Sequence, residues 1–348
     1  MANILDIRRR IRSVINTRQI TRAMKMISAA RLRRAQERAL AARPYALMLT
    51  NVLKSLVSRA DIYDSTTGEI LHPLLVKRDE QNVLLIVITG DKGLAGAFNA
   101  NILKAASKFI DAKSGKNVEL ETIGRKGRDF LRRRFATAKP RKADSTASPQ
   151  TTLVGEQIGV LNKVDYPLAA ELADRIVERY AETEIDSVYI VYNEFKSVIA
   201  QRLVVEQLLP IDHIGAPEIA QAQEMDLREK QRVLEAVKGE GVSIRPADTS
   251  EVDAQAAAFA AAPVDYIYEQ RPQELFRALL PKYVAIQILH ALLESVAAEH
   301  AARMTAMESA TKNASDMIDS LTLVMNRARQ AKITKEIIEI VSGAAAAS

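Results

Sequence analysis

Cysteine and tryptophan are absent from this chain, and its 348 residues include only 13 glycines, 11 prolines and four histidines. Without cysteine there can be no disulfide, no thiol nucleophile, no cysteine zinc site and no thiol redox switch. None of the histidines is paired at the spacing of metal ligands, so we expect neither a metal site nor a cofactor. The scarcity of glycine and proline predicts a largely helical chain.

Long apolar runs are also lacking. The longest run in the middle of the chain is VLLIVI, from Val83 to Ile88, and it is far too short to cross a bilayer. The N-terminus is charged from Asp6 and Arg8 onward and has no apolar core of a signal peptide. We therefore expect an intracellular protein that is soluble or peripheral to a larger assembly.

Positive charge is concentrated near the N-terminus. The net charge is +6, and the residues up to Arg43 include twelve Arg or Lys against two acids. Such an excess favours an acidic protein surface or nucleic acid as the partner. The basic segment 8–34 has no aromatic side chain that could stack on bases. A basic helix with an apolar stripe is more typical of protein docking, and nucleic acid remains the weaker alternative.

The first part of the chain predicts a long helix. Residues 1–58 contain no glycine, and Ile4, Ile7, Ile11 and Val14 follow the 3-4-3 spacing of one helical stripe. The stretch from the N-terminus to Arg43 alone would reach roughly 65 Å as a helix. A helix of that length does not pack inside one small domain.

The last part predicts a second long helix. From Lys282 to Ser342 there is neither glycine nor proline, which allows about 90 Å of continuous helix. Mostly apolar and small residues recur there at steps of seven, three and four, which is typical of a coiled coil. The predicted seam is Leu289, Val296, His300, Arg303, Met307, Ala310, Ala314, Met317, Leu321, Val324, Ala328 and Ala331. We expect the two terminal helices to form one antiparallel coiled coil.

Between these helices, short apolar runs alternate with helical periods. Strands are expected at VLLIVI, VELETI (118–123), SVYIVY (187–192) and LVVEQLL (203–209), and a loop is expected at 139–152. Alternation of strands and helices predicts an α/β domain with a parallel sheet.

The turn TGDKGLAGAFN follows the first strand and precedes a helix, where phosphate-binding loops occur. Its glycines are Gly90, Gly93 and Gly96, with Asp91 and Lys92 between the first two. The pattern is neither GxGxxG nor GxxxxGK[ST], so we expect a tight turn and not a nucleotide site. An independent nucleotide-binding enzyme is a further interpretation that depends on this turn alone.

No catalytic constellation is recognisable. Glu336 and Glu339 lie three apart on the terminal helix, but carboxylates beside Lys335 are more often surface charges than an acid and base pair. Ser, His and Asp occur in no nucleophile motif.

The chain finishes with an apolar helix, ITKEIIEIVSGAAAA, which places Ile333, Ile337, Ile340 and Val341 on one side. Chain ends are usually poorly ordered unless something ties them down. This end therefore calls for a partner that buries it.

Three motifs closely resemble the gamma subunits of rotary ATP synthases. They are RIRSVINTRQITRAMKMISAARLRRAQ, ITGDKGLAGAFN and NASDMIDSLTLVMNRARQAKITKEIIEIVSGAAA, in that order along the chain. The resemblance covers residues 1–210 and 263–347. It implies an α/β fold with a Rossmann-like parallel sheet that binds no nucleotide, beside an antiparallel coiled-coil shaft of the terminal helices.

The resemblance also implies roles by position. Met24 and Lys25 match the zone of the shaft that faces an acidic loop of a beta subunit, and the basic Arg33 and Arg34 would face the same loop. The residues that match positions facing the surrounding ring are Arg329, Gln330, Thr334 and Glu336. None of these residues would be catalytic, because the family's ATP sites lie in the ring.

The function that the resemblance implies is that of a central rotating shaft, present in one copy. Such a subunit transmits torque between a proton-driven c-ring and a ring of alternating alpha and beta subunits, imposes asymmetry on the catalytic sites and regulates ATPase activity and proton flow. The expected partners are the alpha, beta and epsilon subunits and the c-ring. The expected location is peripheral, on the cytoplasmic face of the bacterial plasma membrane. A structural coiled-coil protein or a nucleic-acid-binding protein is the alternative.

One segment departs from the family pattern. Residues 215–262 are longer than the corresponding part of most bacterial members, and they predict a surface insertion in which Leu227, Leu234 and Val237 suggest a short amphipathic helix. The predicted parts are an N-terminal shaft helix at 1–58, a connector at 59–79, the α/β domain at 80–281 and a C-terminal shaft helix at 282–348.

Overall fold

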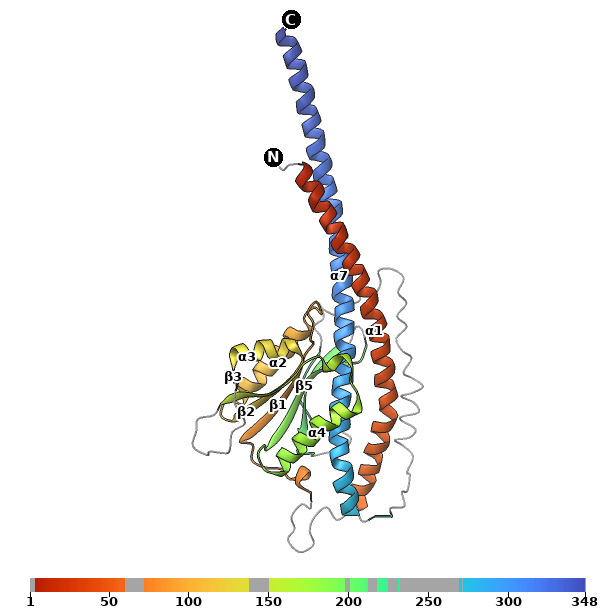
Figure 1. Cartoon of the computed structure of the whole chain (residues 1–348), viewed down its shortest axis with the longest axis vertical. Helices are drawn as coiled ribbons and strands as arrows, with labels where there is room; N and C mark the ends of the chain where they lie inside the picture. The colour runs from red at the N-terminus through yellow and green to blue at the C-terminus, as the bar shows by residue number, and fades with distance from the viewer. Residues whose placement is uncertain are drawn as a thin grey trace.

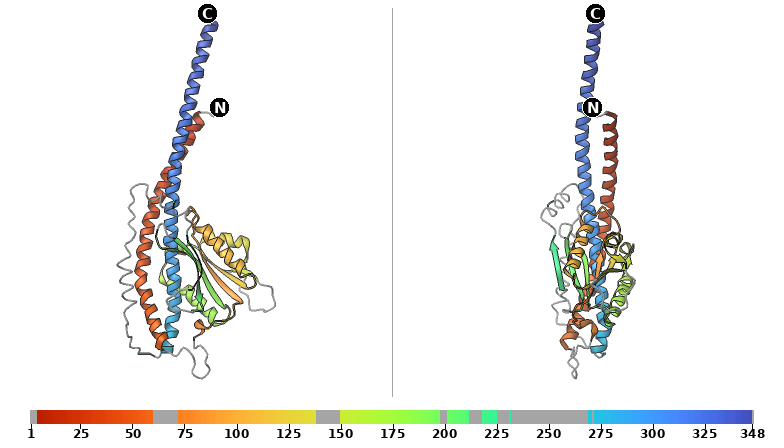
Figure 2. Two further views of the ribbon diagram at one scale, coloured as in Figure 1. Left: turned by 180° about the vertical axis from the view of Figure 1, so that it is seen from behind. Right: turned by 90° about the vertical axis from the view of Figure 1, so that its left-hand side faces the viewer.

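The computed structural model describes residues 4–59, 72–137, 150–197, 201–211, 218–224, 231, 269–270 and 272–347. Two long helices, α1 (Ile4–Arg59) and α7 (Pro272–Ala347), form a rod, and an α/β domain lies against its lower half (Figures 1 and 2). At 1.5 Å per residue, α1 is about 85 Å long and α7 about 115 Å. The C-terminal end of α7 extends beyond the N-terminal end of α1 (Figure 1).

The two helices pair in opposite directions. Thr21 Oγ1 of α1 lies 2.8 Å from Thr311 Oγ1 of α7. Further along α1, Leu32 packs with Ala301 and Ala297 of α7 in one apolar cluster. Rising residue numbers on α1 meet falling numbers on α7, so the predicted antiparallel coiled coil is confirmed.

The seam follows the predicted stripe on α1 but departs from it near the end of α7. Ile7 is buried. On α7, Met317 is 53% exposed and Val324 is 45% exposed, whereas their neighbours Ile318 and Met325 are half-buried. The predicted seam is therefore wrong by one residue at these two positions, and its last member, Ala331, is exposed where α7 extends beyond α1. Both members of each apolar pair fit a 3-4 spacing, so periodicity alone could not choose between them.

Helix α7 begins ten residues earlier than the sequence predicts, and Pro281 lies inside it. An internal proline removes one backbone hydrogen bond and costs about 3 kcal/mol. Phe276 and Leu280 lie on this first part of the helix and are buried in the core of the α/β domain. Burying two such side chains contributes about 1.5–3 kcal/mol each, which offsets the proline.

The α/β domain contains a seven-stranded sheet of order β3-β4-β2-β1-β5-β6-β7. Its elements are β1 (Asn82–Ile88), α2 (Phe98–Ala112), β2 (Asn117–Ile123), α3 (Arg125–Arg134), β3 (Ala136–Thr137), β4 (Thr151–Gln157), α4 (Tyr166–Ala181), β5 (Ser187–Phe195), β6 (Gln201–Leu209) and β7 (Glu218–Glu224). All four strands expected from the sequence are present. Strands β3, β4 and β7 were not predicted, and β4 begins within the expected loop at 139–152, most of which lies outside the described residues.

The sheet is mixed and not wholly parallel as predicted. Strands β1 to β5 pair in parallel, but β6 runs antiparallel to β5, and β7 runs antiparallel to β6. Only residues 196–200 separate β5 from β6, and a parallel pairing needs a crossover of a dozen or more residues. The short connection therefore dictates the antiparallel direction.

Two apolar cores cover the two faces of the sheet. Leu84 and Ile86 of β1 belong to the core that includes α4, α7 and the lower end of α1. Leu85 and Val87 point to the other face, into the core that includes α2 and α3. The shaft is thus part of the domain's own core.

The apolar part of α7 also contains a window with a mean hydropathy of 1.2 over 18 residues, which passes a test for membrane spans by length and composition. Half of that window is buried inside the structure. A core helix gives the same result, and α7 lies in the core that covers one face of the sheet.

The predicted insertion at 215–262 begins with structure that belongs to the sheet. Strand β7, from Glu218 to Glu224, pairs with β6 through six of its seven residues. The amphipathic helix suggested by Leu227, Leu234 and Val237 lies outside the described residues. The domain boundaries stay predictions, with β7 now assigned to the sheet.

A carboxyl group is buried in the sheet. Glu206 of β6 is 5% exposed, and the hydroxyl of Tyr192 donates a hydrogen bond of 2.8 Å to its Oε2 atom. Burial raises the pKa of Glu206 to about 7, although the hydrogen bond from Tyr192 opposes the rise. The folded chain therefore holds a proton there at pH values where the unfolded chain has released it.

We predict that Glu206 makes the chain less stable as pH rises from about 4.5 to 7. The folded state binds the extra proton in this window, so the free energy of unfolding falls with pH, by about 3 kcal/mol in total for this group. Glu206→Gln keeps an acceptor for Tyr192 without a titration. Urea unfolding at pH 5 and pH 8 should show a smaller loss of stability in the variant. An identical loss in both proteins would show that Glu206 titrates normally.

We also predict that residues 232–262 can be replaced by a short Gly-Ser linker without loss of folding, because loop-closure entropy changes slowly with length. A matched deletion of 215–262 removes β7 and leaves an edge of β6 unpaired, so it should lower the midpoint of urea unfolding. The prediction fails if the first deletion destabilises the chain as much as the second.

Candidate functional site

The end of α7 is the most exposed apolar surface of the rod. Ile333 is 46% exposed, Ile337 55%, Ile338 58%, Ile340 71% and Val341 62%. This segment extends past the N-terminal end of α1, so α1 does not cover it (Figure 1). Contiguous exposed apolar residues of this kind mark an interaction site. We call residues 329–342 the shaft tip.

Charged side chains of the shaft tip pair along the helix. Lys332 lies 3.6 Å from Glu336, and Lys335 lies 3.5 Å from Glu339. Both are exposed pairs four residues apart, which contribute little to stability. Glu336 and Glu339 are therefore surface charges, as the sequence predicted.

The other predicted contact residues of α7 are exposed on the same tip. Arg329 and Gln330 are exposed, and the exposed Thr334 donates its hydroxyl hydrogen to the Gln330 carbonyl oxygen over 3.0 Å. These side chains are open to a partner, because no other described element lies beside α7 at this level (Figure 1).

The sequence interpretation required Lys25 to lie on an exposed face of the shaft. The structure instead places it against α7. Its ammonium pairs with Glu308 of α7, and the two side chains are only 15% and 18% exposed. Met24 beside it is half-buried. Lys25 therefore holds the two helices together and is not free to meet an acidic partner.

Arg33 and Arg34 are exposed as predicted. The Arg33 side chain is 84% exposed and its Nε atom donates to Glu37 over 3.1 Å. These arginines lie close in sequence to Leu32, which packs at the level of Ala301 on α7. From there to Gln330 is 29 residues of α7, or roughly 45 Å. The predicted contacts therefore form two separate zones along the rod.

The glycine turn between β1 and α2 is a closed structural joint. The Gly90 N–H donates to Asn99 Oδ1 over 2.8 Å. The Asp91 carboxylate accepts from the N–H of Arg125 over 3.0 Å and from the N–H of Gly159 over 3.1 Å. Asp91 thus occupies the N-terminus of α3, where an anion would otherwise bind.

Helix α7 fills the space in front of this turn. A Cβ atom on Gly90 would lie 2.7 Å from Glu299 Oε1, so a larger residue there would displace the Glu299 carboxylate. Arg303 pairs with Glu299, and its Nη2 atom reaches the Gly93 carbonyl oxygen over 3.4 Å. Lys92 is exposed and contributes its carbonyl oxygen to Arg303 over 3.5 Å. Gly96, the last glycine of this predicted turn, has a positive φ of 56°.

The buried charges at this joint shift the pKa values of their neighbours. Burial raises the pKa of Glu299, and Arg303 partly opposes the rise. Burial, with Arg303 and Arg31 nearby, lowers the pKa of His300 to about 4. His300 is therefore neutral near pH 7, and Arg303 Nη1 lies 3.4 Å from its Nδ1 atom.

Sequence reasoning placed Arg303 in the coiled-coil seam as an interruption and missed Glu294 and Glu299. Their signal was present, because these charged residues interrupt an otherwise apolar part of the last helix. All three are buried, at 3%, 7% and 7% exposure for Glu294, Glu299 and Arg303. A charge that interrupts an apolar helix indicates a specific buried partner.

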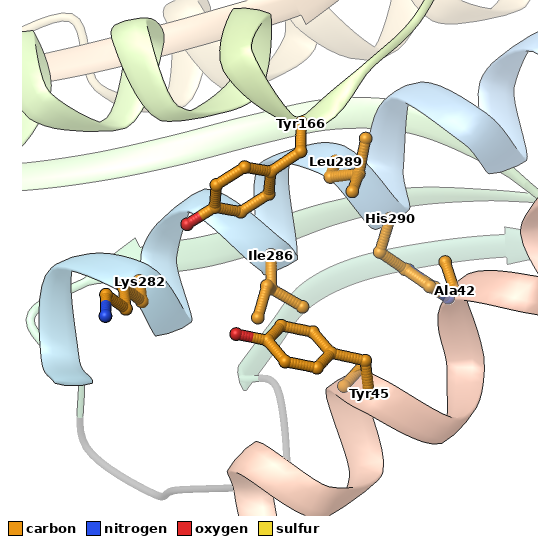
Figure 3. Close-up of a pocket in the computed structure, with 8 residues that line it drawn as sticks. Ala42, Tyr45, Tyr166, Lys282, Ile286, Leu289 and His290 are labelled. Atoms are coloured by element: carbon orange, nitrogen blue, oxygen red, sulfur yellow. The ribbon is translucent and has the colours of Figure 1, made fainter.

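A surface hollow of about 420 Å³ lies lower on the rod, between α1, α4 and α7 (Figure 3). Figure 3 shows the rings of Tyr45 and Tyr166 on opposite sides, with their hydroxyls directed toward the side on which Lys282 lies. The residues that line it are Ala42, Tyr45, Ala46, Tyr166, Lys282, Ile286, Leu289 and His290. They include no glycine turn, so the hollow does not resemble a phosphate site.

The arrangement suits docking better than chemistry. Within the described ranges, no group of three or more His, Asp or Glu side chains is placed to hold a metal ion. The turn that could have bound a nucleotide is filled by Glu299 and Arg303. Among the described residues, the shaft tip and the exposed arginines of α1 are two surfaces open to a partner.

We predict that Lys25 and the exposed arginines respond differently to charge reversal. Lys25→Glu breaks the pair with Glu308 and should cost about 1–3 kcal/mol of stability, whereas Arg33→Glu with Arg34→Glu should change it by about 0.5 kcal/mol or less. Urea unfolding measures both. Lys25→Glu combined with Glu308→Lys should regain most of the loss, and an unrescued double variant would show that the pair does not join the helices.

Comparison with known proteins agrees with the sequence resemblance. A family model described as ATP synthase matches residues 3–347. The chain is 48% identical over 347 residues to the ATP synthase gamma chain of Solibacter usitatus, covering 100% of both chains. It is 44% identical over 346 residues to that of Geobacter metallireducens, covering 99% of this chain and 98% of the other.

The fold also has a counterpart among solved structures. A chain from the central stalk and c-ring of the Tetrahymena thermophila mitochondrial ATP synthase matches with a TM-score of 0.52 and 23% identity, over 84% of this chain and 99% of that chain. The full-length identity to bacterial relatives and the family match agree with this rod and mixed sheet. The chain therefore belongs to the family of ATP synthase gamma chains, and it is a subunit of an enzyme complex.

Proposed function

We propose that this chain is the central rotating shaft of an ATP synthase. It transmits torque between a proton-driven c-ring and a ring of alternating alpha and beta subunits, and it imposes asymmetry on the catalytic sites of that ring. The observation that carries the proposal is the apolar shaft tip, which extends beyond α1 and remains exposed in the isolated chain.

The shaft tip fits an apolar sleeve in a larger assembly. A helix with exposed isoleucines at 333, 337, 338 and 340 is not expected to stand in water in its working state. Its charges are paired along the helix by exposed ion pairs. Such pairs contribute about 0–1 kcal/mol each, so they add little that would lock the tip to one position of the sleeve.

An asymmetric rod can make identical sites unequal. A shaft changes the affinity of a site only through contacts that differ between states, and each tenfold difference requires about 1.4 kcal/mol. The rod has two helices over most of its length and one helix at the tip, so it presents a different surface to each direction around its axis (Figure 2). Rotation would then carry each site through every affinity.

The exposed arginines of α1 support contact with an acidic loop of a beta subunit. Arg33 and Arg34 point away from α7 and carry no partner on it among the described residues. We leave Lys25 out of this proposed contact because its ammonium pairs with Glu308 of α7. On the tip, Arg329, Gln330, Thr334 and Glu336 would face the alpha and beta ring.

The remaining partners are assigned to the lower part of the molecule. The α/β domain and the lower ends of α1 and α7 would contact the epsilon subunit and the c-ring. One copy of the chain would serve each complex, peripheral to the cytoplasmic face of the bacterial plasma membrane. Through these contacts the chain would also regulate ATPase activity and proton flow.

The chain itself would not be catalytic. The turn at Gly90 is closed by Glu299, and the anion position at α3 is filled by Asp91. We therefore expect the isolated chain neither to bind ATP tightly nor to hydrolyse it. The α1 arginines keep nucleic-acid binding as the alternative, which would show as a strong salt dependence of binding.

We predict that the chain rotates inside an assembled alpha and beta ring during ATP hydrolysis. Because the chain has no cysteine, Lys108→Cys on the exposed side of α2 provides a unique attachment for a bead. Single-molecule microscopy would record the rotation. Ile337→Asn with Ile340→Asn should weaken assembly, whereas Lys335→Ala on the same tip should not.

Two results would contradict the proposal. The first is failure of the purified chain to co-purify with alpha and beta subunits while it binds DNA at physiological salt. The second is stoichiometric ATP binding by the chain alone in a calorimeter. Either would replace the shaft with a nucleic-acid-binding protein or an independent nucleotide enzyme.

A further inference from the structure

The sheet has a crevice of the type that binds ligands in other α/β folds. Strands β1 and β5 are neighbours, and the chain leaves β1 through α2, which belongs to the core on one face. It reaches β5 through α4, which belongs to the core on the other face. Ligands of open α/β sheets bind at such a reversal, outside the carboxyl ends of the strands.

In this chain α7 lies at that position. The Glu294 Oε2 atom accepts a hydrogen bond of 2.9 Å from the N–H of Phe195, the last residue of β5. The Glu299 carboxylate lies against Gly90, which follows the end of β1 by two residues. Two carboxylates of the shaft therefore meet the ends of the two strands that flank the reversal.

Arg303 completes the contact from the same helix. Its guanidinium pairs with Glu299 and donates to the carbonyl oxygen of Gly93 from Nε and Nη2, each over 3.4 Å. It also reaches the carbonyl oxygen of Lys92 over 3.5 Å. One buried arginine thus ties the helix to the turn that follows β1.

These polar contacts stand among small apolar residues. Ala297, Ala298 and Ala301 of α7 are fully buried around them. Apolar burial has no preferred direction, and small side chains such as these interlock less with their neighbours than large ones do. Hydrogen bonds to fixed carbonyl oxygens have direction, and buried polar groups are best attested as devices that fix register.

We propose that Glu294, Glu299 and Arg303 are positioning residues that set the rotation and height of α7 on the sheet. The shaft helix occupies the crevice in which other α/β folds hold a ligand. The contact of these three residues with the ends of β1 and β5, which we call the joint, passes torque between the α/β domain and the shaft. The inference rests on the proposed function as a rotor.

The first test removes the directional contacts and keeps the volume. Methionine is unbranched and adapts to irregular spaces, and replacing a buried ion pair by apolar residues of similar volume is often neutral for stability. The Glu299→Met and Arg303→Met double variant should therefore unfold near the wild-type temperature. In the reconstituted ATP synthase it should hydrolyse ATP but pump fewer protons per ATP, by about threefold or more.

The second test closes the joint covalently. A Cβ atom on Gly96 would lie 3.8 Å from the Cβ of Ala306, which is close to the mean of about 3.8 Å in disulfides. The natural chain has no cysteine, so two introduced cysteines can pair only with each other within it. A side chain at Gly96, where φ is 56°, costs about 1–2 kcal/mol. Gly96→Cys with Ala306→Cys should restore pumping in the methionine variant after oxidation and lose it again after reduction.

A matched control removes an ion pair elsewhere on the domain. Arg132 of α3 and Glu156 of β4 pair over 2.6 Å, and Arg132→Met with Glu156→Met should leave pumping per ATP unchanged. If the first methionine variant does not fold, the cysteine pair in the otherwise unaltered chain still decides. If α7 and the turn after β1 stay in fixed contact during rotation, oxidation of this cysteine pair should leave pumping intact. A loss of pumping on oxidation would overturn the proposal.

The outcomes separate the joint from the proposed function. Normal pumping by the Glu299 and Arg303 methionine variant, or pumping that the disulfide does not restore, would overturn the joint while the unaltered chain still couples. A complex that does not couple even with the unaltered chain would overturn the proposed rotor and the joint with it.

Discussion

Burial of one helix along half of its length is the constraint on which this molecule depends. The lower half of α7 supplies Leu280, Val284 and Leu292 to the core of the α/β domain. Its upper half leaves the domain, remains paired with α1 for part of its length and then stands alone (Figure 1). The sheet cannot cover this face without the helix, and the helix cannot hide its apolar side without the sheet. Domain and shaft are consequently one folding unit, and neither has a complete apolar core without the other.

Much of the fold could be predicted because its signals are local. The buried run at 83–88 and the apolar stripe from Ile4 onward have one interpretation each. Strand β4 has no clear local signal, because TTLVGEQ contains a glycine and polar residues and is half-buried. It becomes a strand only by pairing with β2. The direction of β6 depended on the length of a connection and not on its own residues.

The candidate site likewise has features that could be predicted from the sequence and features that could not. The exposure of Ile337 and Ile340 follows from a pattern that is visible in the sequence. The pairing of Lys25 with Glu308 does not, because it joins positions 283 residues apart along the chain. Glu299 was hidden for the same reason, since its meaning depends on a glycine turn more than 200 residues earlier. Long-range polar contacts are the part that sequence patterns do not report.

The uncovered tip of α7 also has a consequence for the life of the protein before assembly. A newly made chain exposes a row of isoleucines to solvent, and no part of its described structure covers them. Exposed apolar patches of this kind are liable to aggregate. Unassembled copies would be subject to chaperones and proteases. Cells that make this subunit in excess of its partners would therefore be expected to lose the surplus by degradation, so its abundance would follow that of the proteins that enclose the tip.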